Sequence, residues 1–120
     1  MSPKKLSLDE RNRLFMTKTY ILNHLHERLP VSFLARMAVM TEPRFREGFL
    51  KVFGMRIRDY VQEARMAFGY FLIVHSDKPI KEIAALSGYD YTQNFMIAFR
   101  KQYGCTPGSI RNEEEDASLS

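Results

Sequence analysis

The stretch IAALSGYDYTQNFMIAFRKQYG, residues 83–104, predicts a short apolar helix, a tight turn at a Ser-Gly pair, and a longer helix that stops at a glycine. Phe95 and Phe99 are four positions apart, so both rings fall on one face of the longer helix and are expected to be buried. Met96 and Ile97 fall on other faces. Either this helix is buried on all sides, or its apolar outer face contacts another molecule.

The pattern of this stretch occurs once more, earlier in the chain. The offset is 79 − 30 = 49 residues in the short helix and 95 − 45 = 50 residues in the long one, so one residue is inserted between the two helices. Each copy is predicted to be a helix-turn-helix, whose second helix offers its outer face to the DNA major groove; a helical repeat that contacts protein is the alternative. The matching pairs are Pro30 and Pro79, Val31 and Ile80, Leu34 and Ile83, Ala35 and Ala84, Phe45 and Phe95, Phe49 and Phe99, Phe53 and Tyr103, and Gly54 and Gly104.

The remaining segments are also predicted to be helical, because none shows the alternation typical of a strand. The chain is therefore expected to be all-α, with about seven helices. They are expected from Ser7 or Asp9 to about Arg28, then over Val31–Val39, Thr41–Gly54, Ile57–His75, Ile80–Leu86 and Tyr91–Tyr103, with a last one beginning near Pro107. The expected packing residues are Leu14, Ile21, Leu22 and Leu25 in the first helix, and Tyr60, Val61, Ala64, Phe68, Phe71 and Leu72 in the longest.

These helices predict four parts of the chain. Two helix-turn-helix subdomains are expected at 8–55 and 77–112, joined by a long linker helix at 56–76. A disordered acidic tail is expected at 113–120.

The charge distribution separates a basic body from this acidic tail. All 18 Lys and Arg precede residue 112, whereas four acidic residues occupy 113–116. Without those four residues the body carries 18 − 10 = +8, compared with a formal net charge of +4 for the chain. A basic body indicates a polyanionic partner, most often nucleic acid, although charge that serves only solubility is the alternative.

Other classes of protein are disfavoured by the composition. No apolar run is long enough to span a membrane, no signal peptide precedes the first helix, and a single cysteine fits a reducing, cytoplasmic compartment. His24 and His26 are two apart on a helix and point to different faces, so they make a poor metal pair. Cys105 has no neighbour in sequence that would activate its thiol, and no glycine-rich phosphate loop is present. We therefore expect no enzyme, no cofactor and no metal site.

The second copy resembles the conserved pattern of AraC/XylS-type transcription regulators, in order and at the family's spacing. The resemblance extends through the weaker first copy and covers about residues 8–112. The residues that carry it are Ile83, Ala84, Gly88, Tyr89, Phe95, Phe99, Arg100, Gly104, Thr106, Pro107, Ile110 and Arg111.

The resemblance implies two helix-turn-helix units on a long helix, with two recognition helices in successive major grooves on one face of double-stranded DNA. Such grooves recur every ~34 Å, and a linker helix of about 28 Å with flanking packing fits that spacing. The resemblance also implies an activator that contacts RNA polymerase at the bacterial nucleoid. The domain is expected to be monomeric, whereas a longer protein with a sensing or dimerising domain could be dimeric. A short stand-alone regulator and the end of a longer one both fit the chain, and the second is favoured.

A helical wheel assigns the DNA-facing side of the first recognition helix. With Phe45 and Phe49 inward, the outer face carries Pro43, Arg46, Glu47 and Leu50, flanked by Lys51. Arg46 is expected to bond to guanine. Glu47 either accepts from a cytosine amino group or pairs with a neighbouring cation. Arg44 and Lys51 are expected to hold phosphates.

In the second recognition helix the outer face carries Gln93, Ile97 and Arg100, with Met96 at its side and Thr92 near its start. Gln93 is expected to pair with adenine and Ile97 to contact thymine methyl groups. Several members of the family carry a base-reading arginine at the position of Ile97, so guanine reading from this helix is not expected. Lys81 is expected to hold a phosphate, and Arg111 to hold the final helix in place. The alternative to all of this is a helical protein-interaction module without specific DNA binding.

Overall fold

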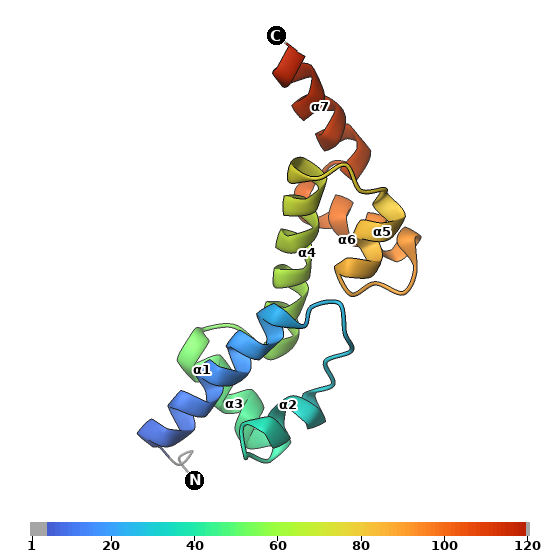
Figure 1. The fold of residues 1–120 in the computed structure, drawn as a ribbon. Helices are drawn as coiled ribbons and strands as arrows, with labels where there is room; N and C mark the ends of the chain where they lie inside the picture. Colours follow the sequence, from blue (N-terminus) through green and yellow to red (C-terminus); the bar gives the residue numbers. More distant parts are fainter. Residues whose placement is uncertain (1–4, 120) are drawn as a thin grey trace. The chain divides into compact units, whose positions relative to one another are not determined.

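The computed structural model of the protein describes residues 5–119, with side chains described as far as Glu113 (Figure 1). All regular secondary structure among the described residues is helical, which confirms the all-α prediction. The helices are α1 (Leu8–Asn23), α2 (Val31–Met37), α3 (Glu42–Phe53), α4 (Ile57–His75), α5 (Ile80–Leu86), α6 (Thr92–Tyr103) and α7 (Pro107–Leu119).

The chain divides into two compact units. Among the described residues, the first unit contains 5–24 and 28–61, and the second contains 25–27 and 62–119. The helix predicted as a separate linker, α4, is therefore shared: residues 57–61 belong to the first unit and 62–75 to the second.

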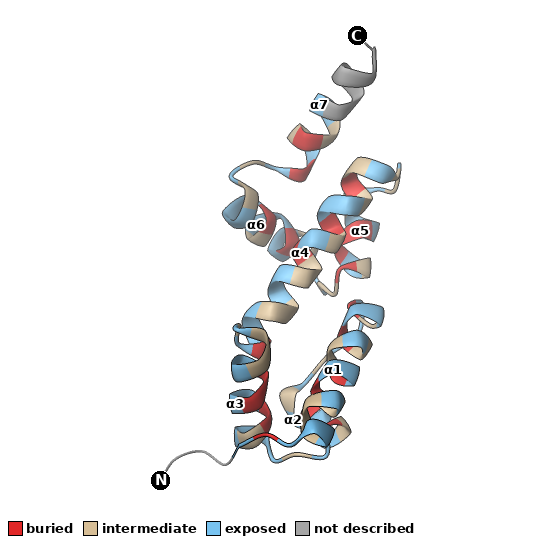
Figure 2. Cartoon of the chain, turned by 90° about the vertical axis from the view of Figure 1, so that its left-hand side faces the viewer, coloured by how far each residue is buried: buried red, intermediate tan, exposed pale blue. Residues whose placement is uncertain are grey.

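In the first unit α1, α2 and α3 pack on one another around an apolar core (Figure 2). The rings of Phe45 and Phe49 are fully buried, with centroids 5.8 Å apart, as expected from their spacing. Thr17 is also buried, and its hydroxyl is satisfied by donating to the Arg13 carbonyl oxygen at 2.8 Å. The other buried apolar residues of this core include Leu14, Ile21, Leu34, Ala35, Ala38 and Ile57.

The second unit is built around α4, α5, α6 and the start of α7. Gly69 lets α6 approach α4 closely, since a Cβ atom at this position would lie 2.7 Å from the Phe95 ring. Phe71, expected to pack, is instead 55% exposed, and its ring contacts His75 at 4.6 Å between centroids. The buried residues of this core are Met66, Ile73, Ile83, Ala84, Phe95, Phe99 and Ile110.

The first helix is shorter than predicted, ending at Asn23 rather than near Arg28. His24 leaves the helical region at φ −136°, ψ 31°. The carbonyl oxygens of Leu25 and Glu27 then accept hydrogen bonds from Arg65, a residue that sequence neighbours cannot reveal. The prediction that Leu22 packs inward was also wrong, since this side chain is 50% exposed.

The last helix is longer than predicted. Pro107 occupies its first position, and no further glycine or proline follows Gly108, while Glu and Ala favour a helix. The structure therefore places residues 113–119 within α7, where a disordered tail was expected. Ser120 lies outside the described residues.

Candidate nucleic-acid interface

The outer face of α3 is formed as the helical wheel predicted. Thr41 caps the helix by accepting from the Arg44 amide at 3.3 Å, and Gly54 ends it at φ 72°. Burial of two phenylalanines fixes which side faces outward. The residues that the structure leaves exposed on α3 include Pro43, Arg46, Glu47, Leu50 and Lys51.

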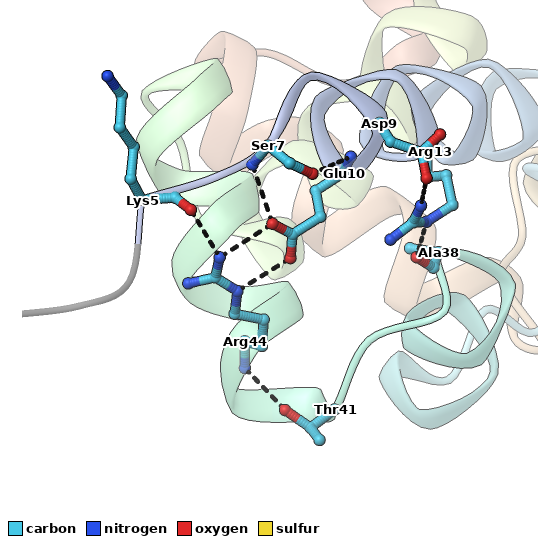
Figure 3. A network of polar contacts seen from close by, with 8 residues as sticks. All are labelled: Lys5, Ser7, Asp9, Glu10, Arg13, Ala38, Thr41 and Arg44. Carbon is cyan, nitrogen blue, oxygen red and sulfur yellow. Dashed lines mark hydrogen bonds and ion pairs between the residues drawn. The ribbon is translucent and has the colours of Figure 1, made fainter.

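Arg44, for which a phosphate contact is predicted, is hydrogen-bonded within the first unit (Figure 3). Its Nε and Nη2 atoms donate to the two carboxylate oxygens of Glu10, each at 3.1 Å, and Nη2 also donates to the Lys5 carbonyl oxygen at 3.3 Å. Such a two-pronged pair holds both planar groups in one orientation. In this structure Arg44 fastens α3 to the start of α1.

Glu10 is held in place from two directions. Its carboxylate accepts from the Ser7 amide at 2.9 Å, while the Ser7 hydroxyl accepts from the Glu10 amide at 3.0 Å, which forms a capping box at the start of α1. The hydrogen bond from Arg44, followed by that from the Ser7 backbone, lowers the pKa of Glu10 from 4.5 to about 2. The same pairing raises the pKa of Arg44.

The outer face of α6 is more apolar than that of α3. Phe95 and Phe99 are fully buried, whereas Ile97 is 60% exposed. The helix is therefore not buried on all sides, and its apolar residues are available for contact. Gln93, Met96 and Arg100 are exposed on the same helix.

Three further polar residues lie at the start of α6 and on α5. Thr92 is half-buried, and the predicted phosphate ligand Lys81 is exposed on α5. Tyr91, at the N-cap position of α6, is 70% exposed and is not among the predicted site residues. A tyrosine hydroxyl can donate to DNA phosphates, so this exposed side chain directly before α6 is a further candidate for a phosphate contact.

Arg111 does hold the final helix in place, as predicted, although its partners are uncharged. It donates to the carbonyl oxygens of Ile73 at 3.2 Å, Ser76 at 3.0 Å and Lys78 at 2.7 Å. These bonds join the start of α7 to the end of α4 and the loop that follows it. Arg111 is therefore a structural residue of the second unit.

Within the described part of the chain, no group of three or more metal-binding side chains comes together. No described helix has the length and apolar character to cross a membrane.

Two successive helix-turn-helix motifs, each with an exposed second helix, define the protein class as a double helix-turn-helix protein. A family model described as "Helix-turn-helix domain" matches residues 34–113. The chain belongs to this family, which is of the AraC/XylS type, and the resemblance drawn from its motifs is confirmed.

Curated relatives are longer than this chain. It is 30% identical over 98 residues to the probable transcriptional regulator LumQ of Photobacterium leiognathi, covering 82% of this chain and 40% of that protein. It is 30% identical over 107 residues to the HTH-type transcriptional regulator ExsA of Pseudomonas aeruginosa, covering 89% of this chain and 37% of that protein. Relatives named as transcription regulators agree with the prediction that the chain is not an enzyme.

Solved structures share the fold. The DNA-binding domain of AdpA, a global transcriptional factor crystallised with a target DNA, matches at a TM-score of 0.83 and 26% identity. The match covers 88% of this chain and 95% of that domain.

Proposed function

We propose that the chain is the sequence-specific DNA-binding part of a transcription regulator, and that α3 and α6 are its recognition helices. The observation that carries this proposal is the repeated arrangement of each helix, in which two buried phenylalanines fix an exposed outer face. The family of the chain and the AdpA domain solved with its target DNA add support.

The two recognition helices differ in the contacts they can make. On α3, Arg46 can donate two bonds to guanine, and Glu47 can accept from a cytosine amino group. On α6, Gln93 can pair with adenine, while Ile97 and Met96 suit thymine methyl groups. We assign base reading by hydrogen bonds mainly to α3, and apolar base contact to α6.

The residues that flank these base-reading positions are assigned to phosphate contacts and to the fit of the protein against the DNA backbone. Lys51, Lys81 and Arg100 are exposed cations that suit phosphate contact. Thr92 and Pro43 lie in the first turns of α6 and α3, where the chain approaches the DNA backbone. Arg44 is assigned to the fold, because it is bonded to Glu10.

The chain spans about 40% of the length of the curated relatives it matches, and the role of a whole regulator is a further part of the proposal. We propose activation through contact with RNA polymerase, in the bacterial cytoplasm at the nucleoid. The DNA-binding part acts as a monomer on an asymmetric target, and a dimerising or sensing domain would lie elsewhere in a longer protein.

Selection of bound sequences from random duplex DNA tests the proposal. We expect enrichment of two motifs about one helical turn apart. Binding of the selected duplex should then weaken steeply with added salt, with log K falling by about 0.9 per phosphate contact for each unit of log salt.

A negative result in either experiment would argue against sequence-specific DNA binding. Without enrichment, sequence-specific binding is excluded. A flat salt response would favour a protein-interaction module that uses the exposed Leu50, Met96 and Ile97 for a partner.

A further inference from the structure

The internal repeat extends further than the helix-turn-helix motifs, because α1 and α4 also correspond. Leu14 and Ile21 of α1 are buried in the first core, as Met66 and Ile73 of α4 are in the second. The offset is the same for both pairs, since 66 − 14 = 52 and 73 − 21 = 52. The same offset relates Arg13 to Arg65 and Thr17 to Gly69. Each motif is thus preceded by a helix that carries an arginine at one equivalent position.

In the first unit this arginine bonds to the turn of its own motif. Arg13 Nε donates to the carbonyl oxygen of Ala38 at 2.7 Å, and the guanidinium also pairs with Asp9 (Figure 3). Ala38 is the residue that ends α2, directly before the turn into α3. Arg13 therefore ties the turn that precedes the recognition helix to α1.

In the second unit Arg65 reaches the corresponding turn through a packed segment. Its Nε donates to the Leu25 carbonyl oxygen at 3.3 Å, and its Nη2 donates to the Glu27 carbonyl oxygen at 2.8 Å. A Cβ atom on Gly88 would lie 2.3 Å from the Leu25 oxygen and 2.5 Å from Arg65 Nε. The guanidinium and the segment 25–27 thus form the surface on which the turn at Gly88 rests.

The surroundings of Arg65 are consistent with such a fixed position. Burial lowers the pKa of Arg65, while the neighbouring Tyr89 and Asp90 act in the opposite direction. The Tyr89 hydroxyl donates to Gln62 Oε1 at 3.0 Å, on the same helix as Arg65. The turn is therefore also joined directly to α4 by this hydrogen bond.

The recognition helix α6 depends on this support more than α3 does. The N-cap residue of α6, Tyr91, makes no side-chain capping bond, whereas Thr41 caps α3. An uncapped first turn leaves amide groups without an internal partner and frays more easily. The contacts that hold the preceding turn then decide where α6 begins.

We propose that Arg65 is a positioning residue for the recognition helix α6, and that Arg13 has the same role for α3. This inference rests on the proposed function. It adds two residues that contact no DNA but set the position of the helices that do.

The test compares Arg65→Ala with its matched counterpart Arg13→Ala on the selected duplex. The variants Arg46→Ala and Gln93→Ala first assign which half-site belongs to which helix, by footprinting. Two further duplexes then carry one intact half-site each, with the other scrambled, and binding is measured at low salt. We expect Arg65→Ala to weaken binding to the α6 half-site by about tenfold, the size expected for losing hydrogen bonds from a charged group, with less than about a twofold change at the α3 half-site. Arg13→Ala should give the reverse pattern.

Amide hydrogen exchange and a conservative variant separate positioning from loss of folding. Exchange at the Gly88 and Tyr89 amides, which donate to Ala85 O and Ala84 O, should speed up in Arg65→Ala, while the Phe99 amide inside α6 stays protected. Arg65→Lys keeps the charge and a donor, and should restore part of the lost affinity at the α6 half-site only.

Three outcomes would overturn the inference. Equal losses at both half-sites in each variant would indicate a general effect on folding. Unchanged exchange at the Gly88 and Tyr89 amides would indicate that Arg65 does not hold the turn. Wild-type protein that binds neither half-site would remove the proposed function itself, and the inference with it.

Discussion

The two helix-turn-helix units make the same turn with different residues. The first turn runs Ala38-Val39-Met40-Thr41, and the second runs Ser87-Gly88-Tyr89-Asp90-Tyr91. Val39 has φ 56° and Gly88 has φ 87°, so both lie in the left-handed region. The backbone bonds also correspond, since the Met40 amide donates to Ala35 O at 2.9 Å and the Tyr89 amide donates to Ala84 O at 3.0 Å.

The difference between the turns lies in their surroundings. The Val39 side chain is 71% exposed, so only the unfavourable backbone conformation acts against it. At Gly88 the Leu25 oxygen and the Arg65 guanidinium fill the space that a Cβ atom would need. The left-handed φ therefore disfavours a side chain in both turns, but only in the second turn does close packing also leave no space for one.

The largest effect is expected when the valine of the first turn is placed at the glycine position of the second. Gly88→Val should destabilise the second unit by about 3 kcal/mol or more, because it adds a clash with backbone to an unfavourable φ. Urea unfolding followed by amide signals from each unit measures this. Gly108→Ala is the control, since no atom lies within 4 Å of a Cβ there, and it should change stability little. A Gly88→Val protein as stable as wild type would remove the distinction between the turns.

A residue that tolerates the left-handed region better than valine should stabilise the first unit. Val39→Asn should raise its unfolding free energy by about 1 kcal/mol, because asparagine tolerates the left-handed region better than a β-branched residue does. Val39→Ala, which removes branching but keeps the Cβ atom, should give less. A loss of stability in Val39→Asn would mean that the exposed valine makes contacts that offset its strain.

Lowering the pH should destabilise the first unit before the second. Among the described groups, only the first unit contains a carboxylate whose pKa is lowered to this extent. The pKa of Glu10 falls to about 2 in the folded protein, so its contribution is complete above about 4.5 and is lost as the pH falls from there towards 2. Arg65 and Arg111 instead donate to carbonyl oxygens, which do not titrate in this range.

Hydrogen exchange between pH 5 and pH 2.5 measures this difference. Amides of α1 and α3 should lose protection before those of α6 in the wild-type protein. Glu10→Gln should be less stable at neutral pH and should lack this extra acid sensitivity. Loss of protection in both units at the same pH, in wild type and variant alike, would argue against the ion pair as the cause.

The smallest effect is expected at the first residue of each turn. Ser87 is fully buried, and its hydroxyl has no hydrogen-bond partner in the described structure, whereas Ala38 holds the equivalent position. Ser87→Ala should therefore be neutral or should stabilise the second unit by about 1 kcal/mol or less. Thermal unfolding measures the change, and a clear loss of stability would reveal a partner for the hydroxyl, such as a buried water.

The sequence predicted the fold wherever its local signals were strong. Helix α5 and the long helix α4 have the predicted bounds, because glycine and proline mark their ends. The phenylalanine pairs likewise fixed the buried faces of α3 and α6. Periodicity and punctuation are local properties, and a single sequence is sufficient to reveal them.

Features set by residues far apart in sequence were missed. The end of α1 and the role of Arg44 depend on bonds that span 40 and 34 residues, and no helical wheel contains them. Phe71 lies on α4 beside buried residues, yet the packing of the second unit leaves it exposed. The wheel found the outward residues of both recognition helices, but it could not distinguish a cation that is free to meet DNA from one bonded to Glu10.

The placement of residues 25–27 in the second unit has a consequence for dividing the protein. A fragment that begins at residue 56 would contain α4, α5, α6 and α7, yet it would lack the segment that receives the hydrogen bonds of Arg65. In such a fragment the half-buried guanidinium of Arg65 would have lost those carbonyl acceptors. The turn at Gly88 would also lose the Leu25 carbonyl against which it packs. The two copies are thus duplicates in pattern without being interchangeable modules, and a boundary drawn at the start of α4 would cut through the second one.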